Sequence, residues 1–107
     1  MSAPLDFGGA VLLIVGDIPA GRVMTYGDIA AELGSRGARA VGRVMATEGS
    51  RVPWWRVVRA DGRPAAGHEV EALIHYRDEG TPLRAGAADD DVHAYRLDLH
   101  AARWAPS

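Results

Sequence analysis

Arginine is the residue type in this chain whose placement most strongly suggests chemistry. All twelve basic side chains are Arg, and seven of them lie between positions 36 and 63, where only Glu48 and Asp61 are acidic. That segment carries a net charge of +5, whereas the remainder, with five basic and twelve acidic residues, carries −7. A basic segment on an acidic body favours a nucleic-acid-binding face. A preference for Arg codons would explain the absence of Lys but not the clustering. The seven residues are Arg36, Arg39, Arg43, Arg51, Arg56, Arg59 and Arg63.

Other kinds of site chemistry are poorly represented in the chain. It has no Cys, which excludes disulfides, thiolate catalysis and thiolate metal sites together. The four histidines, at 68, 75, 93 and 100, show no spacing typical of metal ligands, and we expect neither a metal nor a cofactor. The longest apolar run, at 10–15, is too short to span a bilayer, and the N-terminus lacks the features of a signal peptide. We therefore expect a cytoplasmic protein.

The N-terminal half is predicted to contain three helices. Apolar residues at helical spacing predict the first over 6–16. Thr25 is a good N-cap for a second helix over 25–33, and Asp28 can complete a capping box with it. A tight turn containing glycine then leads to a third helix over 38–47. Two short helices joined by such a turn indicate a helix-turn-helix.

The third predicted helix is unusual because much of its surface is nearly bare. Ala38, Ala40 and Gly42 carry little or no side chain, and Gly42 costs about 1 kcal/mol of helix stability relative to Ala. Arg39 and Arg43 lie four residues apart on one side. A slim helix with guanidinium groups suits close approach to a nucleic-acid backbone. Small residues are equally suited to close packing against another helix, and the spacing alone does not choose between the two.

The segment after the third helix is predicted to form a small β wing. Residues 56–59 read as a short strand and 61–62 as a tight turn, and a second strand near Pro64 would have to be an edge strand. A helix-turn-helix followed by a hairpin is a winged helix-turn-helix, so the predicted fold is mainly α with a small β wing. We expect one domain spanning 1–107.

The C-terminal half is predicted to contain a further helix and a short strand. The helix runs from 68 to 79 and stops at the Gly-Thr-Pro that follows it, and residues 85–91 are predicted to form a loop. Residues 95–99 alternate as a strand would, and Trp104 is expected to pack back onto the body. The residues expected to face the core from the helix are Val70, Leu73, Ile74 and the stem of Arg77.

Four motifs together resemble a known family. The segments are Val-Met-Thr-Tyr-Gly-Asp-Ile-Ala at 23–30, Ala-Arg-Ala-Val-Gly at 38–42, Val-Pro-Trp-Trp-Arg-Val-Val at 52–58 and Leu-Ile-His-Tyr-Arg-Asp-Glu-Gly at 73–80. In this order they resemble the alkyltransferase-like proteins, which are relatives of the DNA-binding domain of O6-alkylguanine-DNA alkyltransferases. The family's enzymes carry Pro-Cys-His-Arg-Val in the third motif, where the Cys accepts the alkyl group.

The resemblance implies a mode of DNA binding. In the family, the helix-turn-helix enters the minor groove, an Arg enters the base stack, and the damaged guanine rotates into a pocket. Arg39 holds the position of that Arg, and Tyr26 that of a Tyr contacting the flipped base. Met45 falls near the gap left in the duplex, and Val57 where a backbone carbonyl accepts from the guanine. The residues expected to contact DNA are Thr25, Tyr26, Ala38, Arg39, Ala40, Gly42, Arg43 and Met45.

The chain departs from the family pattern in the pocket. Trp54 stands in place of the nucleophilic Cys, and Trp55 in place of the His that relays a proton away from it. A basic residue that some relatives place after the wing has only His68 as its counterpart. Arg56 and Glu79 are expected to hold the pocket loop rather than to touch the lesion. The residues expected to line the lesion pocket are Tyr26, Pro53, Trp54, Trp55, Arg56, Val57 and His68.

These features predict a non-enzymatic DNA-damage sensor. It would bind duplex DNA containing O6-alkylguanine, flip the base into the pocket and flag it for the proteins of nucleotide excision repair. The first alternative is a winged-helix transcription regulator with major-groove readout. A second is a transferase or glycosylase that uses another residue, which the absence of Cys, Lys and a metal-ligand set disfavours. Taken without the motifs, Trp54 would be a core residue and Tyr26 a surface residue. Winged-helix regulators are usually dimers, whereas this sequence has no dimerisation helix, and we expect a monomer that does not bind membranes.

Overall fold

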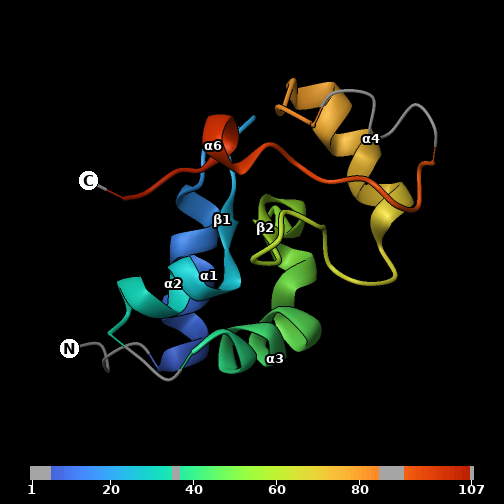
Figure 1. Cartoon of the computed structure of the whole chain (residues 1–107). Coiled ribbons are helices and arrows are strands. Elements are labelled where there is room, and N and C mark those ends of the chain that lie inside the picture. The colour runs from blue at the N-terminus through green and yellow to red at the C-terminus, as the bar shows by residue number, and fades with distance from the viewer. Residues whose placement is uncertain (1–5, 35–36, 85–90, 107) are drawn as a thin grey trace.

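The computed structural model describes residues 6–34, 37–84 and 91–106. The predicted turn at 34–37 and the predicted loop at 85–91 therefore fall largely outside the described residues, and so does Arg36. Figure 1 shows the chain from blue at the N-terminus to red at the C-terminus. In these described ranges no helix is long and apolar enough to cross a membrane.

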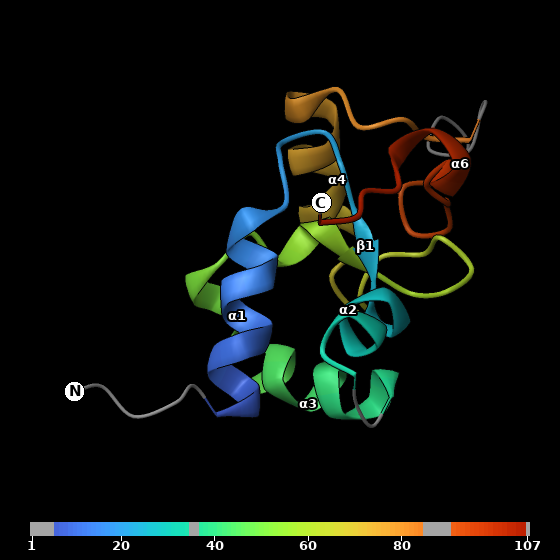
Figure 2. The ribbon, with the colours of Figure 1, turned by 90° about the vertical axis from the view of Figure 1, so that its left-hand side faces the viewer.

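The three N-terminal helices form as the sequence predicts. Helix α1 spans Phe7–Asp17, α2 spans Tyr26–Glu32 and α3 spans Ala38–Glu48. The capping box of α2 is present, because the Thr25 hydroxyl accepts from the backbone N–H of Asp28 at 3.0 Å and the Asp28 carboxylate accepts from that of Thr25 at 3.1 Å. Figure 2 shows α3 crossing the ends of α1 and α2, so the helix-turn-helix prediction is confirmed.

A two-stranded parallel sheet, which the sequence did not suggest, joins the two halves of the chain. Strand β1 is Met24–Thr25 and β2 is Val57–Val58, with Met24 opposite Val57 and Thr25 opposite Val58. The loop between α3 and β2 is wound into two short 3₁₀ helices, η1 at Gly49–Arg51 and η2 at Trp54–Arg56. A parallel pair needs a long crossover connection, and here α2, α3 and both 3₁₀ turns provide it.

The prediction of a β-hairpin wing is wrong, although the mainly helical fold with a small sheet is confirmed. The turn forms, since the Gly62 N–H donates to the Arg59 carbonyl at 2.9 Å. No second strand follows it in the described part of the chain, because Pro64 has no N–H to donate to a ladder. The turn packs instead on the C-terminal stretch, where the Leu97 N–H donates to the Gly62 carbonyl at 2.8 Å.

Helix α4 forms at Glu69–Glu79 and ends at Gly80, which has the left-handed backbone that favours glycine (φ 69°). Its inward face differs from the prediction. Val70 is 42% exposed and Ile74 67% exposed, and Arg77 is exposed as well. Ala72, Leu73 and Tyr76 are buried instead. Val70 and Ile74 therefore lie on the outer side of the helix, because Tyr76 fixes which face turns to the core.

The C-terminal stretch crosses both halves of the molecule. The strand predicted at 95–99 is reduced to one antiparallel bridge between Leu83 and Leu97, and a short helix α6 follows at Leu99–Ala102. The Asp98 carboxylate caps α6, which explains why the alternating pattern does not continue as a strand. Trp104 packs against the N-terminal core, so this prediction is confirmed.

The residues of the small sheet enter two hydrophobic cores. In Figure 1 the strands lie between α1 and α2 on one side and α4 on the other. Met24 and Val57 enter the core of α1, α2 and α3, whereas their neighbours Val23 and Val58 enter the core of α4 and the C-terminal stretch. This division follows from the alternation of side chains along a strand. Tyr26 and Met45 pack against the first core, and Trp54 and Trp55 against the second. The N-terminal core comprises Val11, Val15, Ile18, Met24, Ile29, Ala30, Val41 and Val57.

Thr25→Ala should destabilise the protein, because it leaves the first turn of α2 without its side-chain acceptor. We expect the free energy of unfolding to fall by about 0.5–2 kcal/mol. Chemical denaturation followed by circular dichroism measures the change. Thr47→Ala is the matched control, since this exposed hydroxyl bonds only to carbonyls of its own helix. Equal losses in the two variants would contradict the capping role.

Candidate nucleic-acid interface

A cavity of about 470 Å³ opens beside Trp54. It lies where α3, the two 3₁₀ turns and the segment before α4 meet, and it is open to solvent along α3. Trp54 is half-buried and is not sealed in the interior. The residues that matter most in its lining are Tyr26, Gly42, Met45, Trp54, His68 and Glu71. A volume of several hundred cubic ångströms is typical of a site for a small molecule or a single base.

Aromatic rings surround Trp54 on the protein side of this cavity. Its ring centroid lies 5.4 Å from that of His68, 5.7 Å from that of Trp55 and 5.9 Å from that of His75. The contacts with Trp55 and His75 are edge-to-face, which aromatic pairs favour. The indole of Trp54 is therefore held by its neighbours before any ligand arrives.

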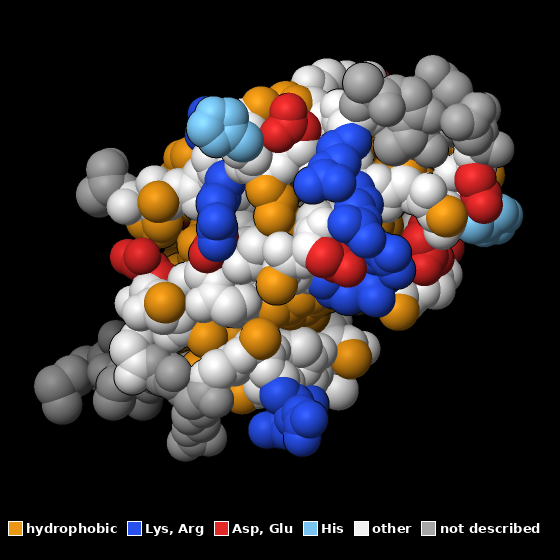
Figure 3. Space-filling model, in the orientation of Figure 1, with side chains coloured by type: hydrophobic (Ala, Val, Ile, Leu, Met, Phe, Trp, Pro, Cys, Tyr) orange, Lys and Arg blue, Asp and Glu red, His pale blue; other side chains and the backbone are white. Residues whose placement is uncertain are grey.

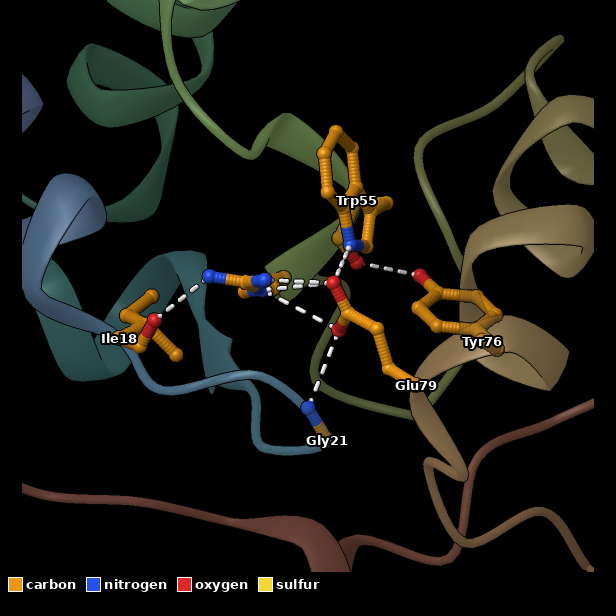
Figure 4. Close-up of polar contacts among 6 residues, drawn as sticks. Ile18, Gly21, Trp55, Tyr76 and Glu79 are labelled. Carbon is orange, nitrogen blue, oxygen red and sulfur yellow. Dashed lines mark hydrogen bonds and ion pairs between the residues drawn. The ribbon is translucent and has the colours of Figure 1, made fainter.

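Trp55, next to Trp54, faces away from the cavity into a polar network (Figure 4). Its indole N–H donates to Glu79 at 2.9 Å, and its carbonyl accepts from the Tyr76 hydroxyl. One face of its ring is stacked on His75, with 3.6 Å between centroids and 6° between planes. Trp55 is thus fixed through its ring, its N–H and its backbone.

Glu79 is the centre of that network. It forms an ion pair with Arg56 and accepts from the backbone N–H of Gly21 at 3.0 Å as well as from Trp55. Arg56 also donates to the carbonyl of Ile18 at 2.9 Å. Burial raises the pKa of Glu79, but the hydrogen bonds from Arg56, Gly21 and Trp55 outweigh it and hold the pKa below its ordinary value. The prediction that Arg56 and Glu79 hold the pocket loop is confirmed by these contacts.

Helix α3 presents basic groups and an open backbone to solvent. Arg39 and Arg43 are exposed, and Figure 3 shows basic side chains over this part of the molecule. Ala40 is buried in the protein, whereas a Cβ built on Gly42 would meet nothing within 4 Å outside its own helix. The small residues of α3 therefore serve both close packing inside the protein and an open helix surface. Ala40 allows internal packing, and Gly42 leaves the cavity mouth open.

The structure brings some of the expected site residues together and separates others. Tyr26, Gly42, Met45, Trp54 and His68 line the cavity. Burial raises the pKa of Tyr26 above its ordinary value of 10, so its hydroxyl is protonated at neutral pH and can donate a hydrogen bond. The remaining residues expected in the pocket or at the interface lie outside the lining. They are Thr25, Ala38, Arg39, Ala40, Arg43, Pro53, Trp55, Arg56 and Val57.

The positions of the outlying residues have local causes. Val57 is fully buried as part of β2, and Thr25 is buried as the N-cap of α2. Pro53 and Trp55 belong to the turn that presents Trp54. Glu71 lines the cavity and was missed by sequence reasoning, although its spacing of three residues from His68 was an available signal. Contact with DNA stays a prediction for all the residues expected at the pocket and at the interface.

The fold and the site define a helix-turn-helix domain with a base-sized cavity beside α3, the second helix of the motif. A model of the 6-O-methylguanine DNA methyltransferase DNA-binding domain matches residues 6–76. The chain belongs to this family. Trp54 stands at the position where the resemblance places the family's reactive Cys, and the chain contains no Cys.

Individual relatives agree with this placement. The DNA base-flipping protein of Escherichia coli (strain K12) is 40% identical over 99 residues, which cover 85% of this chain and 74% of that protein. The crystal structure of S. pombe Atl1 with damaged DNA containing O6-carboxymethylguanine superposes with a TM-score of 0.76 at 30% identity, covering 94% of this chain and 95% of that one. A structure of S. pombe ATL in complex with DNA gives 0.74, also at 30% identity.

Glu79→Gln should destabilise the protein, because Arg56 is left without its counter-charge. We expect the free energy of unfolding at neutral pH to fall by about 1–3 kcal/mol. Since the folded-state pKa of Glu79 is lowered, its contribution is complete above its ordinary pKa of 4.5 and is lost as the pH falls through the folded-state pKa. Denaturation titrations across this range should therefore show a shallower acid limb in the variant than in the wild type.

Asp78→Asn is the control for this experiment, because Asp78 is the exposed neighbour of Glu79 on the same helix. It should leave the acid limb unchanged. If Glu79→Gln and Asp78→Asn behaved alike, the polar network around Glu79 would not hold the pocket loop.

Proposed function

We propose that this protein is a non-enzymatic sensor of O6-alkylguanine in duplex DNA. The observation that carries the proposal is the cavity beside Trp54, which opens along α3 and is lined by Tyr26 and Trp54. A base everted from the duplex would enter it while α3 lies in the minor groove. Relatives named for DNA base flipping and for binding damaged DNA support this reading.

The chemistry available at the site supports binding without repair. An indole carbon skeleton cannot act as a nucleophile and leaving group as a thiolate does. Trp54 therefore provides a wall where the family resemblance places a reactive group. The neighbouring Trp55 has a single ring nitrogen, which cannot accept a proton as the imidazole of a relay His does. Its N–H donates to Glu79. The protein would hold the lesion and leave the alkyl group in place.

The cavity suits an alkylated guanine better than a normal one. An alkyl group on O6 removes the N1 proton and adds apolar surface, so the base loses a donor that would need a partner inside. Aromatic surface such as that of Trp54 offers a base about 1–3 kcal/mol of stacking. Eversion costs a few kcal/mol, and less where damage has weakened the base pair. The two effects together would favour the lesion.

Arg39 would occupy the space that the everted base vacates. It is exposed on α3, and a planar guanidinium can stack on neighbouring bases. Because the alkyl group stays in place, the benefit must come from another protein. We propose that the bound complex marks the lesion for nucleotide excision repair, that the protein acts as a monomer, and that it works at the nucleoid.

Lesion preference tests the proposal directly. Fluorescence anisotropy should show tighter binding to a duplex with O6-methylguanine than to the same duplex undamaged, by about tenfold or more, which corresponds to roughly 1.4 kcal/mol. Arg39→Ala should reduce this preference, whereas Arg77→Ala, an exposed arginine on α4, should not. Equal affinities for both duplexes in the wild type would refute the damage-sensor reading and leave a binder indifferent to alkylation.

Trp54→Ala should remove the stacking surface of the cavity. We expect a loss of about 1–3 kcal/mol in binding to the O6-methylguanine duplex, with little change for undamaged DNA. Trp104→Ala is the control, because this half-buried Trp packs against the N-terminal core and does not line the cavity. A variant that kept full lesion preference without the indole would contradict the role of Trp54. Labelled alkyl groups should stay on the DNA throughout.

A further inference from the structure

A second, smaller cavity of about 170 Å³ lies on the other side of the loop that follows β2. It is lined by three arginines, Arg59, Arg63 and Arg96, together with His93 and Glu69. We call it the arginine cleft. Figure 3 shows a band of basic side chains on the face where the C-terminal stretch crosses this loop. Arg96 lies beyond residue 76, where the match to the family's DNA-binding domain ends.

Backbone hydrogen bonds fix the two segments that carry these arginines, which are the loop after β2 and the C-terminal stretch. The Arg59 N–H donates to the Arg63 carbonyl at 2.8 Å, and the Leu97 N–H donates to the Gly62 carbonyl at 2.8 Å. Gly62 has a positive φ of 87°, and a Cβ there would stand 2.8 Å from the Leu97 carbonyl oxygen. Only glycine therefore allows the loop and the C-terminal stretch to meet this closely, and the meeting places Arg96 beside the arginines of the loop.

The positive charge in the cleft is incompletely neutralised. Asp61 is near, but it forms an exposed pair with Arg63 at 3.4 Å and also accepts from the backbone N–H of Arg63. The Glu69 carboxylate accepts from the Gly67 N–H. Arg59 donates through Nε to the Pro64 carbonyl at 3.1 Å. In the described part of the chain, the guanidinium of Arg96 makes no hydrogen bond or ion pair, although its charge contributes to the lowered pKa of Asp61.

The arginine cleft and the base-sized cavity are lined by different residues of the same loop. Ala65, Ala66 and His68 line the larger cavity, whereas Arg59, Arg63 and Pro64, from the same loop, line the cleft. The charge of Arg59 also reaches Tyr26, where it opposes the rise in the Tyr26 pKa. An anion in the cleft would therefore lie one loop away from a base in the larger cavity.

We propose that the arginine cleft binds a backbone phosphate of the DNA strand whose base enters the larger cavity, with Arg96 as a phosphate ligand supplied by the C-terminal stretch. This inference rests on the proposed function for the position of the strand. Guanidinium groups match phosphate geometry and bind it through paired hydrogen bonds. Phosphate contacts fix the register of a protein on DNA and carry no base information. The cleft would thus anchor the strand, while the larger cavity selects the lesion.

The salt dependence of binding distinguishes an anchor from a selector. For each duplex phosphate that the protein no longer neutralises, the slope of log K against log salt becomes shallower by about 0.9. Arg96→Ala and Arg63→Ala should each reduce the slope by about this amount. They should weaken binding to O6-methylguanine and undamaged duplexes by the same factor, so the preference for the lesion stays constant. Thermal melting checks that each variant is folded.

Arg77→Ala is the matched control, because it removes the same charge from an exposed position that lines neither cavity. Its slope should remain that of the wild type. If Arg96→Ala and Arg63→Ala gave the same slope as Arg77→Ala, the cleft would not contact the backbone and the proposal would be wrong. Failure of the proposed function would appear differently, as equal affinity of the wild type for damaged and undamaged duplexes.

Inorganic phosphate separates a DNA anchor from a site for a free anion. NMR titration of the wild type with phosphate should show weak, non-saturating shifts, because a single phosphate lacks the rest of the strand. Saturable binding of phosphate that depends on Arg96, together with an unchanged salt slope on DNA, would overturn the proposal in favour of a small-anion site.

Discussion

The ion pair between Glu79 and Arg56 connects segments of the chain that lie far apart in the sequence. Glu79 is the last residue of α4, and Arg56 is the last residue of η2, the 3₁₀ turn that contains Trp54 and Trp55. The same carboxylate accepts from Gly21, in the segment between α1 and β1, and Arg56 reaches back to Ile18. Three segments far apart in the sequence therefore meet at one carboxylate, and the aromatic wall of the cavity is built on them.

The small parallel sheet explains why this connection matters. Its two strands contribute alternate side chains to two separate cores, one with α1, α2 and α3 and one with α4 and the C-terminal stretch. A sheet of two residues per strand adds few hydrogen bonds of its own. The polar network around Glu79 lies across the same junction and holds Trp55, the neighbour of Trp54 in the cavity wall. The position of that wall thus depends on how the two cores are joined.

In the functions proposed above, the two cavities would divide recognition into separate tasks. The larger one presents the aromatic surface of Trp54 and would receive an everted base, whereas the arginine cleft presents guanidinium groups and would bind a phosphate. Residues of one loop line both cavities. Replacement of a nucleophile by an indole fits this division, since a protein that only binds benefits from a rigid stacking surface and needs no proton relay.

The sequence by itself determined helices α1 to α4, the capping box of α2, the end of α4 and the absence of thiolate chemistry, because these follow from local spacing and residue type. Thr25 and Asp28 specify the start of α2, and Gly80 specifies the end of α4. Only the tertiary structure decided which partner β2 takes and which side of α4 is buried. The strand at Val57 pairs with residues more than thirty positions earlier, and Tyr76 overrides the apolar pattern of Val70 and Ile74. Packing between distant segments decides the pairing of β2 and the buried face of α4. It also brings Arg96 beside Arg59 and Arg63, which local sequence patterns do not predict because the contact joins distant segments.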